Sequence, residues 1–123
     1  MFVRLGLLIL MSLSLVACSG EDHNNNSAEG VVEAYLLAKV NSDGDEIRNL
    51  ICNDLEASIE RETASFASVE ASIESMECTA EENIVSCTGA IVALYGTENR
   101  EFPLTSYNVV QEDGEWRWCG EGE

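Results

Sequence analysis

The five cysteines are the residues of this sequence whose chemistry is easiest to interpret, and one of them is set apart from the other four by its position. Cys18 directly follows an apolar segment, whereas Cys52, Cys78, Cys87 and Cys119 are spread over the rest of the chain. Four thiols allow three disulfide pairings. Cys78 and Cys87 flank an expected hairpin turn, so we expect them to pair, which leaves Cys52 to join Cys119. A zinc site is the alternative, but no C-x-x-C spacing or nearby histidine supports it.

Acid–base chemistry has few candidates despite the 23 acidic residues. The single histidine, His23, lies in a polar segment, where we expect a solvated side chain rather than a ligand. A small enzyme would therefore depend on a carboxylate with a tyrosine partner. The candidates are Asp54 or Glu56 with Tyr35, Tyr95 or Tyr107. With so many acids in the chain, chance alone explains any such pair.

No cofactor or metal is predicted. The sequence has no Gly-x-Ser-x-Gly motif, no phosphate-binding loop and no cluster of metal ligands. Residues 41–46 have the acidic composition of a calcium loop, but Gly44 stands at the fourth place instead of the sixth. The twelfth place, which should be glutamate, is Cys52.

Cys18 ends the segment Leu15-Val16-Ala17-Cys18, which matches the lipobox of bacterial lipoproteins. Residues 1–17 have the parts of a secretory signal, with Arg4 before an apolar run too short to span a bilayer as a helix. We therefore expect cleavage before Cys18 and a lipid anchor on its sulfur, with the remainder of the chain outside the cytoplasm. The alternative is an ordinary signal peptide with Cys18 as a plain thiol. Ser19 leaves the choice between the two membranes of a two-membrane cell open.

The remainder reads as a short tether, one small domain and a tail. Residues 18–27 contain the lipidated cysteine and a polar segment that cannot bury apolar surface, residues 28–119 form the domain, and residues 120–123 are the tail. Loss of Arg4 with the leader leaves five basic residues against 23 acidic ones, a net charge of −18. Such a charge argues against binding nucleic acid or an anionic membrane surface, so the lipid is the expected membrane contact. It is typical of a well-solvated surface.

The periodicity changes from helical to alternating along the domain. Ser27 can cap a helix over residues 28–40, and Asp43 with Glu46 resembles a capping box for a second helix. That second helix is expected to continue, with a kink near Asn53, to about residue 64. Alternation begins at Val69, and Gly89 is expected to form a bulge or bend within a later strand. The remaining strands are expected over residues 84–95, 102–110 and 115–119, with a tight turn at Asp113-Gly114. Helices followed by an antiparallel meander make the fold class α+β.

A helix pair, long strands and a terminal Asp-Gly-Glu-Trp-Arg-Trp-Cys resemble small bacterial lipoproteins with the nuclear-transport-factor-2-like, or cystatin-like, α+β roll. The resemblance covers roughly residues 28–119. It implies N-terminal helices packed on a curved four-stranded sheet that encloses a conical pocket. Members of that superfamily include isomerases, dehydratases and many non-catalytic binding domains. Catalytic members usually place an Asp–His or similar polar set in the pocket, and this chain has no histidine beyond His23.

The expected register distributes apolar side chains over both faces of the sheet. Centring the turns opposes Cys78 to Cys87, Ala93 to Phe102, and Val109 to Trp118. One face then holds Cys78, Cys87, Ile91, Tyr95, Phe102, Leu104 and Cys119. The other holds Ile73, Val92, Leu94, Tyr107, Val109, Trp116 and Trp118. Helices of this size cover one face, and the Cys52–Cys119 disulfide places them on the first.

Tyr107, Val109, Trp116 and Trp118, here called the tryptophan face, are therefore predicted to form a homodimer or partner surface. The alternative is that both tryptophans belong to the monomer core. A one-residue bulge at Gly89 would exchange part of the assignment.

Three functions are compatible with the sequence. The first is a lipid-anchored, non-catalytic binding or interaction domain, which follows from the expected tether and the lack of a catalytic constellation. The second is a small pocket enzyme of the isomerase or dehydratase kind that uses a carboxylate. The third is a structural spacer in the cell envelope. The sequence names no small-molecule ligand.

Overall fold

The computed structural model describes residues 26–122, and the fold is α+β, with helices first and an antiparallel sheet after them. The leader, Cys18 and most of the expected tether lie outside the described residues. The elements in chain order are α1 (Ala28–Val40), α2 (Gly44–Leu50), the 3-10 helix η1 (Asn53–Ser58), α3 (Ile59–Ala64), β1 (Glu70–Glu81), β2 (Ile84–Tyr95), β3 (Glu98–Pro103), β4 (Ser106–Glu112) and β5 (Glu115–Glu121). Within residues 26–122 no helix is both long and apolar enough to cross a bilayer.

The two expected helix caps are present. Gly30 N–H donates to the Ser27 side chain at 3.0 Å, and α1 spans the predicted residues. Glu46 N–H donates to Asp43 Oδ1 at 3.2 Å at the start of α2. The second helix is shorter than expected, however, because Ile51 forms a parallel bridge with Trp118. That bridge holds the chain extended after α2, so the region expected as one kinked helix is α2, η1 and α3.

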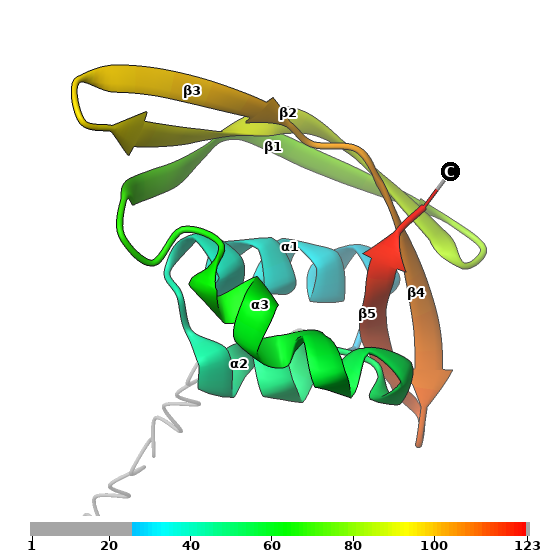
Figure 1. The fold of residues 1–123 in the computed structure, drawn as a ribbon. Helices are drawn as coiled ribbons and strands as arrows, with labels where there is room; N and C mark the ends of the chain where they lie inside the picture. Colours follow the sequence, from blue (N-terminus) through cyan, green and yellow to red (C-terminus); the bar gives the residue numbers. More distant parts are fainter. Residues whose placement is uncertain (1–25, 123) are drawn as a thin grey trace, which may run out of the picture.

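The sheet curves around α1, which lies between the sheet and α2 (Figure 1). Its strand order is β1-β2-β4-β5, and β3 pairs with the C-terminal half of β2. Strand β2 therefore pairs with β1 along one edge and with β3 and then β4 along the other. The sheet has five strands instead of four because the strand expected over residues 102–110 is divided between β3 and β4.

The tryptophan face is not an exposed surface in this structure. Tyr107, Val109 and Trp118 lie in the core under the helices, at 5%, 0% and 4% exposure, and Trp116 is half-buried. The prediction that these residues form an exposed dimer or partner surface was therefore wrong for Tyr107, Val109 and Trp118. The alternative, in which tryptophan belongs to the monomer core, holds for Trp118.

A change of register explains the error. In the β2–β3 ladder, Ile91 opposes Phe102. The pairing is interrupted at Leu104 and Thr105. In the β2–β4 ladder that follows, Val85 opposes Tyr107. A shift of one residue turns every following side chain to the other face of the sheet. Gly89 lies opposite the break, where its carbonyl accepts from Leu104 N–H and its φ is 99°. The expected pairs of Cys78 with Cys87 and of Val109 with Trp118 are present, whereas Ala93 opposes Arg100 and not Phe102.

Both disulfides have the expected pairing. Cys78–Cys87 joins β1 to β2, and Cys52–Cys119 joins the extended segment after α2 to β5. Cys52 N–H also donates to the Trp118 carbonyl at 2.8 Å. The second disulfide therefore fixes the strand that carries Trp118 against the helices.

Candidate functional site

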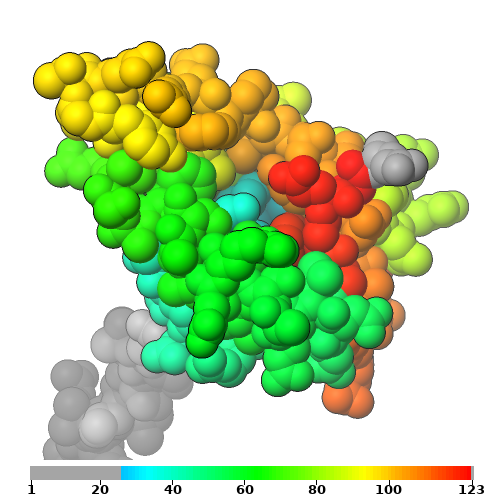
Figure 2. All heavy atoms as spheres, in the orientation of Figure 1, coloured from blue at the N-terminus to red at the C-terminus, as the bar shows by residue number. Residues whose placement is uncertain are grey.

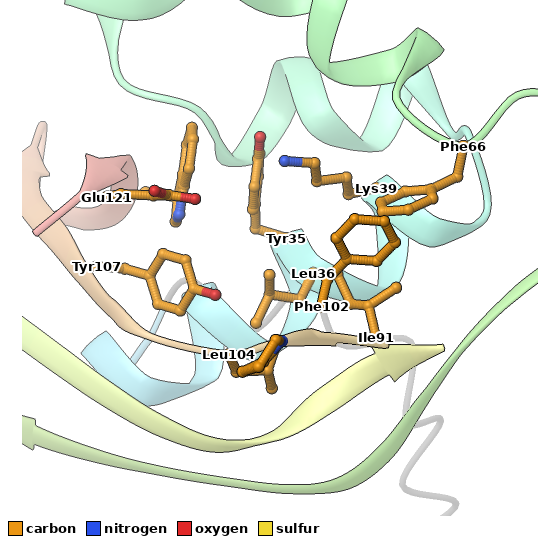
Figure 3. Close-up of a pocket in the computed structure, with 11 residues that line it drawn as sticks. Tyr35, Leu36, Lys39, Phe66, Ile91, Phe102, Leu104, Tyr107 and Glu121 are labelled. Atoms are coloured by element: carbon orange, nitrogen blue, oxygen red, sulfur yellow. The ribbon is translucent and has the colours of Figure 1, made fainter. Parts of the chain in front are cut away.

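A cavity of about 150 Å³ lies between α1 and the concave face of the sheet. Figure 2 shows the molecule hollowed there, with α1 visible at the bottom between the green segment around α3, the orange β3–β4 segment and the red β5. The apolar residues of its lining are Leu36, Phe66, Ile91, Phe102, Pro103 and Leu104. The polar lining residues are Tyr35, Lys39, Tyr107, Trp118 and Glu121 (Figure 3).

Helical spacing explains why α1 provides three of these residues. Tyr35, Leu36 and Lys39 lie within one turn and on the side of α1 that faces the cavity. Tyr35 and Leu36 are buried, and the Lys39 side chain is 21% exposed. The helix thus presents a phenol, an aliphatic group and an ammonium to one small space.

Tyr35 and Trp118 form the most buried polar part of the site. Their rings are stacked, with centroids 3.7 Å apart and planes 9° from parallel. The Tyr35 hydroxyl and the Trp118 indole nitrogen are both buried, and neither has a hydrogen-bond partner within residues 26–122. Leaving a buried donor unpaired costs about 1–3 kcal/mol, so these two groups need an explanation.

Lys39 and Glu62 form an ion pair between α1 and α3, with Nζ and Oε2 3.0 Å apart. The Glu62 side chain is 12% exposed. Its carboxylate lies near the Tyr35 hydroxyl without completing a hydrogen bond of ordinary geometry. Burial raises the pKa of Tyr35 far above its ordinary value, and the negative charge of Glu62 raises it further. Tyr35 is therefore a neutral phenol that can donate a hydrogen bond.

Tyr107 and Glu121 form the polar group on the other side of the cavity (Figure 3). The Tyr107 hydroxyl oxygen accepts from Thr105 N–H at 3.3 Å, so its own proton is available to a further acceptor. Burial raises the pKa of Tyr107, although the bond from Thr105 opposes that shift. Glu121 is exposed at the end of β5 and has no ion pair within the described residues. The polar lining of the cavity therefore combines four side chains that carry donors with one exposed carboxylate, Glu121.

Only part of the sequence-predicted candidate set meets in this cavity. Tyr35 and Tyr107 line it, whereas Asp54 and Glu56 are exposed on η1 and Tyr95 is not among the lining residues. The expected carboxylate–tyrosine pairs with Asp54 or Glu56 are thus not formed at the cavity. Among the described residues no group of three or more histidine, cysteine or acidic side chains could hold a metal ion.

Sequence reasoning missed Lys39 and Trp118 as cavity residues and Glu62 as the partner of Lys39. One signal was available, because Lys39 follows Tyr35 by four residues and so lies on the buried side of α1. A lysine on the buried side of a helix usually has a partner, since a buried charge is costly when unpaired. The partner, Glu62, is on another helix, and no spacing in the sequence identifies it.

The comparisons with known proteins identify the fold. No family model and no curated protein matches the sequence. Among solved structures, a variant whose name marks it as a nuclear-transport-factor-2 chain has a TM-score of 0.56 at 12% identity, covering 79% of this chain and 96% of that one. A candidate ketosteroid isomerase from Shewanella frigidimarina has a TM-score of 0.52 at 16% identity, covering 77% and 93%.

A protein of unknown function from Mycobacterium tuberculosis has a TM-score of 0.52 at 12% identity, covering 76% of this chain and 68% of that one. At these identities the likeness establishes a shared fold. The chain has the nuclear-transport-factor-2-like α+β roll that its sequence resembles.

Proposed function

We propose that this chain is a lipid-anchored, extracytoplasmic domain that binds a small molecule in the cavity under its sheet without chemically changing it. The observation that carries the proposal is the cavity between α1 and the sheet, whose lining combines apolar side chains with the polar groups of Lys39, Tyr107 and Glu121. A cavity that served only as a packing defect would be apolar. A bound ligand explains both the space and its polar lining.

The envelope location is supported by the cysteines. The lipobox ending at Cys18 would place the chain on a membrane, and two disulfides fit an oxidising compartment. We expect the native chain in the membrane fraction and a Cys18→Ser variant in the soluble fraction. Equal partition of both chains to the soluble fraction would contradict the anchor.

Binding without catalysis is favoured by the state of Glu62, the carboxylate beside the Lys39 ammonium. A general base in an apolar pocket needs a carboxylate free to take a proton, and Glu62 is instead paired with Lys39 at 3.0 Å. The ion pair balances the two charges. The polar groups that remain for a ligand are therefore mainly the hydrogen-bond donors of the cavity lining.

The test is native mass spectrometry of the full chain carrying Cys18→Ser after exposure to an extract of its source cells. We expect a discrete small-molecule adduct. Leu104→Phe, which adds volume to the cavity wall, should abolish the adduct, whereas Leu37→Phe should keep it. Leu37 is 47% exposed, so the control adds the same ring outside the cavity. An adduct of equal abundance in both variants, or no adduct on the starting chain, would contradict the proposal.

The alternative function is a small isomerase-like enzyme. The observation that favours it is Glu121, a carboxylate at the cavity that has no ion pair within the described residues and lies near Tyr107. In that case Glu121 would move a proton while tyrosine donates to the developing oxyanion. The two functions differ in the fate of the adduct. A ligand released from the protein with a changed mass, or with exchange of carbon-bound deuterium that Glu121→Gln abolishes, would favour the enzyme.

A further inference from the structure

We infer that the side of β1, β2 and β3 that points away from α1 binds a segment of a partner protein in which basic and apolar side chains alternate. This outer face has Val92 and Leu94 at its centre and Glu70, Glu74 and Glu101 around them. The helices lie on the other side of the sheet, as does the cavity (Figure 1). The outer face is therefore separate from the site of the proposed function.

A groove crosses the outer face where the three strands pair. Val92 and Leu94 of β2 line it, together with residues 70–72 of β1 and Asn99 of β3. Both aliphatic side chains are half-buried, whereas Ile91 and Ala93, which alternate with them, are buried on the inner face. Val92 and Leu94 do not belong to the core cluster, so they leave apolar surface in contact with solvent.

Carboxylates flank this aliphatic strip on both outer strands. Glu70 of β1 opposes Leu94, and Glu101 of β3 opposes Val92, so each pair projects from the same face of the sheet. Glu74 lies on that face too, four residues further along β1. Strand spacings of about 4.8 Å and a rise of about 3.4 Å per residue place the three Cα atoms within about 14 Å of one another. All three side chains are exposed and have no ion pair within the described residues.

No basic side chain of these strands balances the three carboxylates. Arg100 is the one basic residue of β1, β2 and β3, and it opposes Ala93 on the inner face. Its guanidinium carbon lies there 5.0 Å from the centre of the Tyr95 ring. The outer face thus combines an aliphatic strip with negative charge on both sides. Long basic side chains suit such a surface, because their methylene stems cover apolar groups while their charged ends reach the carboxylates.

The same charges decide between the possible occupants. A second copy would bring its own acidic face against this one, and like charges across an interface cost affinity. Residues 18–27 of the chain itself contain Glu21 and Asp22 and no lysine or arginine. An anionic membrane surface would be repelled as well. A basic segment of another protein is the occupant that the outer face favours.

The test measures the binding of three labelled heptapeptides to the full chain with Cys18→Ser by fluorescence anisotropy. Lys-Leu-Lys-Val-Lys-Leu-Lys supplies charge and apolar side chains, and Lys-Ser-Lys-Ser-Lys-Ser-Lys supplies the charge alone. Glu-Leu-Glu-Val-Glu-Leu-Glu reverses the charge. We expect the leucine–lysine peptide to bind at least about fivefold more tightly than the serine peptide, because it covers the aliphatic strip. The glutamate peptide should not bind.

Two triple variants locate the binding site. The first neutralises the carboxylates of the outer face by Glu70→Gln, Glu74→Gln and Glu101→Gln. It should weaken the leucine–lysine peptide about tenfold, since each exposed ion pair contributes about 1.4-fold to fivefold. The control makes the same change of net charge at exposed residues of η1 and α3, by Asp54→Asn, Glu56→Gln and Glu60→Gln. It should weaken the peptide by less than about twofold, because these residues lie on the helical side of the sheet.

Three results would overturn the inference. The first is equal weakening by the two triple variants, because net charge and not the outer face would then govern binding. The second is equal affinity of the leucine–lysine and serine peptides, or no binding of either. The third is a dimer in sedimentation that Leu94→Lys converts to a monomer, because a second copy would then cover the face. The mass-spectrometric adduct reports on the cavity independently of all three results.

Discussion

The Lys39–Glu62 pair gives the sharpest test of how the cavity is built. The two side chains are 21% and 12% exposed, so the pair is neither fully buried nor fully exposed. Exposed ion pairs contribute about 0.2–1 kcal/mol to stability, and removing one partner of a buried ion pair costs about 3–5 kcal/mol. We therefore expect Lys39→Met and Glu62→Leu each to lower the free energy of unfolding by about 2 kcal/mol. Urea denaturation with a common m-value measures this loss as a lower midpoint.

The double variant carries the test. Removing both charges leaves no unpaired ion, so Lys39→Met with Glu62→Leu should unfold within about 1 kcal/mol of the starting chain. Arg48→Met is the control, because the Arg48–Asp45 pair is 64% and 96% exposed and should contribute at most about 0.5 kcal/mol. A double variant that loses the sum of the two single losses would refute the reasoning.

The same variants should change what the cavity accepts. Glu62→Leu leaves the Lys39 ammonium without its balancing charge beside Tyr35. A small carboxylate, cyclohexanecarboxylate, should then gain affinity for the cavity relative to the uncharged cyclohexanone, and calorimetric titration measures that ratio. An unchanged ratio would show that the ion pair does not control ligand charge.

Three further predictions concern pH, backbone and cross-links. The pKa of Tyr35 is raised, so the unfolded chain releases this proton near pH 10 while the folded chain retains it; stability should fall above pH 10 by about 1.4 kcal/mol per pH unit, and Tyr35→Phe should reduce that slope. Gly89→Ala should cost at least about 2 kcal/mol, because its φ is +99° and the added carbon would lie 2.5 Å from a backbone oxygen of Glu74, whereas Gly96→Ala, which meets nothing within 4 Å, should cost about 1 kcal/mol; urea midpoints compare them. Replacing both cysteines by serine should cost about 2.7 kcal/mol for the disulfide with a sequence separation of 9 and about 4.4 kcal/mol for the one with a separation of 67. The reverse order in thermal unfolding would contradict the loop-closure argument.

The features that the sequence predicted well depend on neighbouring residues. Ser27 and Asp43 cap their helices as expected because a cap requires only a side-chain oxygen and an amide three residues on. The bounds of β2 and the Asp113-Gly114 turn were also predicted, since turn chemistry is local. The disulfide pairing followed from the expected hairpin turn between Cys78 and Cys87. These signals sufficed for the fold class.

The features that failed depend on contacts between distant segments. The face of Trp118 was assigned wrongly because one residue of register at Leu104 and Thr105 reverses everything after it. The length of the second helix was wrong because Ile51 pairs with Trp118, a tertiary contact that helical periodicity does not contain. Both errors hid the surroundings of Tyr35. Trp118 and Glu62 come close to Tyr35 only when β5 and α3 are placed correctly.

The two halves of the sheet are joined unequally, and this bears on how the cavity opens. Strands β1 and β2 pair at ten positions, whereas β2 and β4 pair at three, from Ile84 to Ser86. Separation at the short ladder breaks few backbone hydrogen bonds, whereas the Cys52–Cys119 disulfide keeps β5 on the helices, so the β2–β4 ladder is where the sheet can open locally. We expect the amides of this short ladder to exchange with solvent sooner than those of β1, and a ligand bound in the cavity between α1 and the sheet to slow that exchange. The strand arrangement would then set the rate at which the cavity fills and empties.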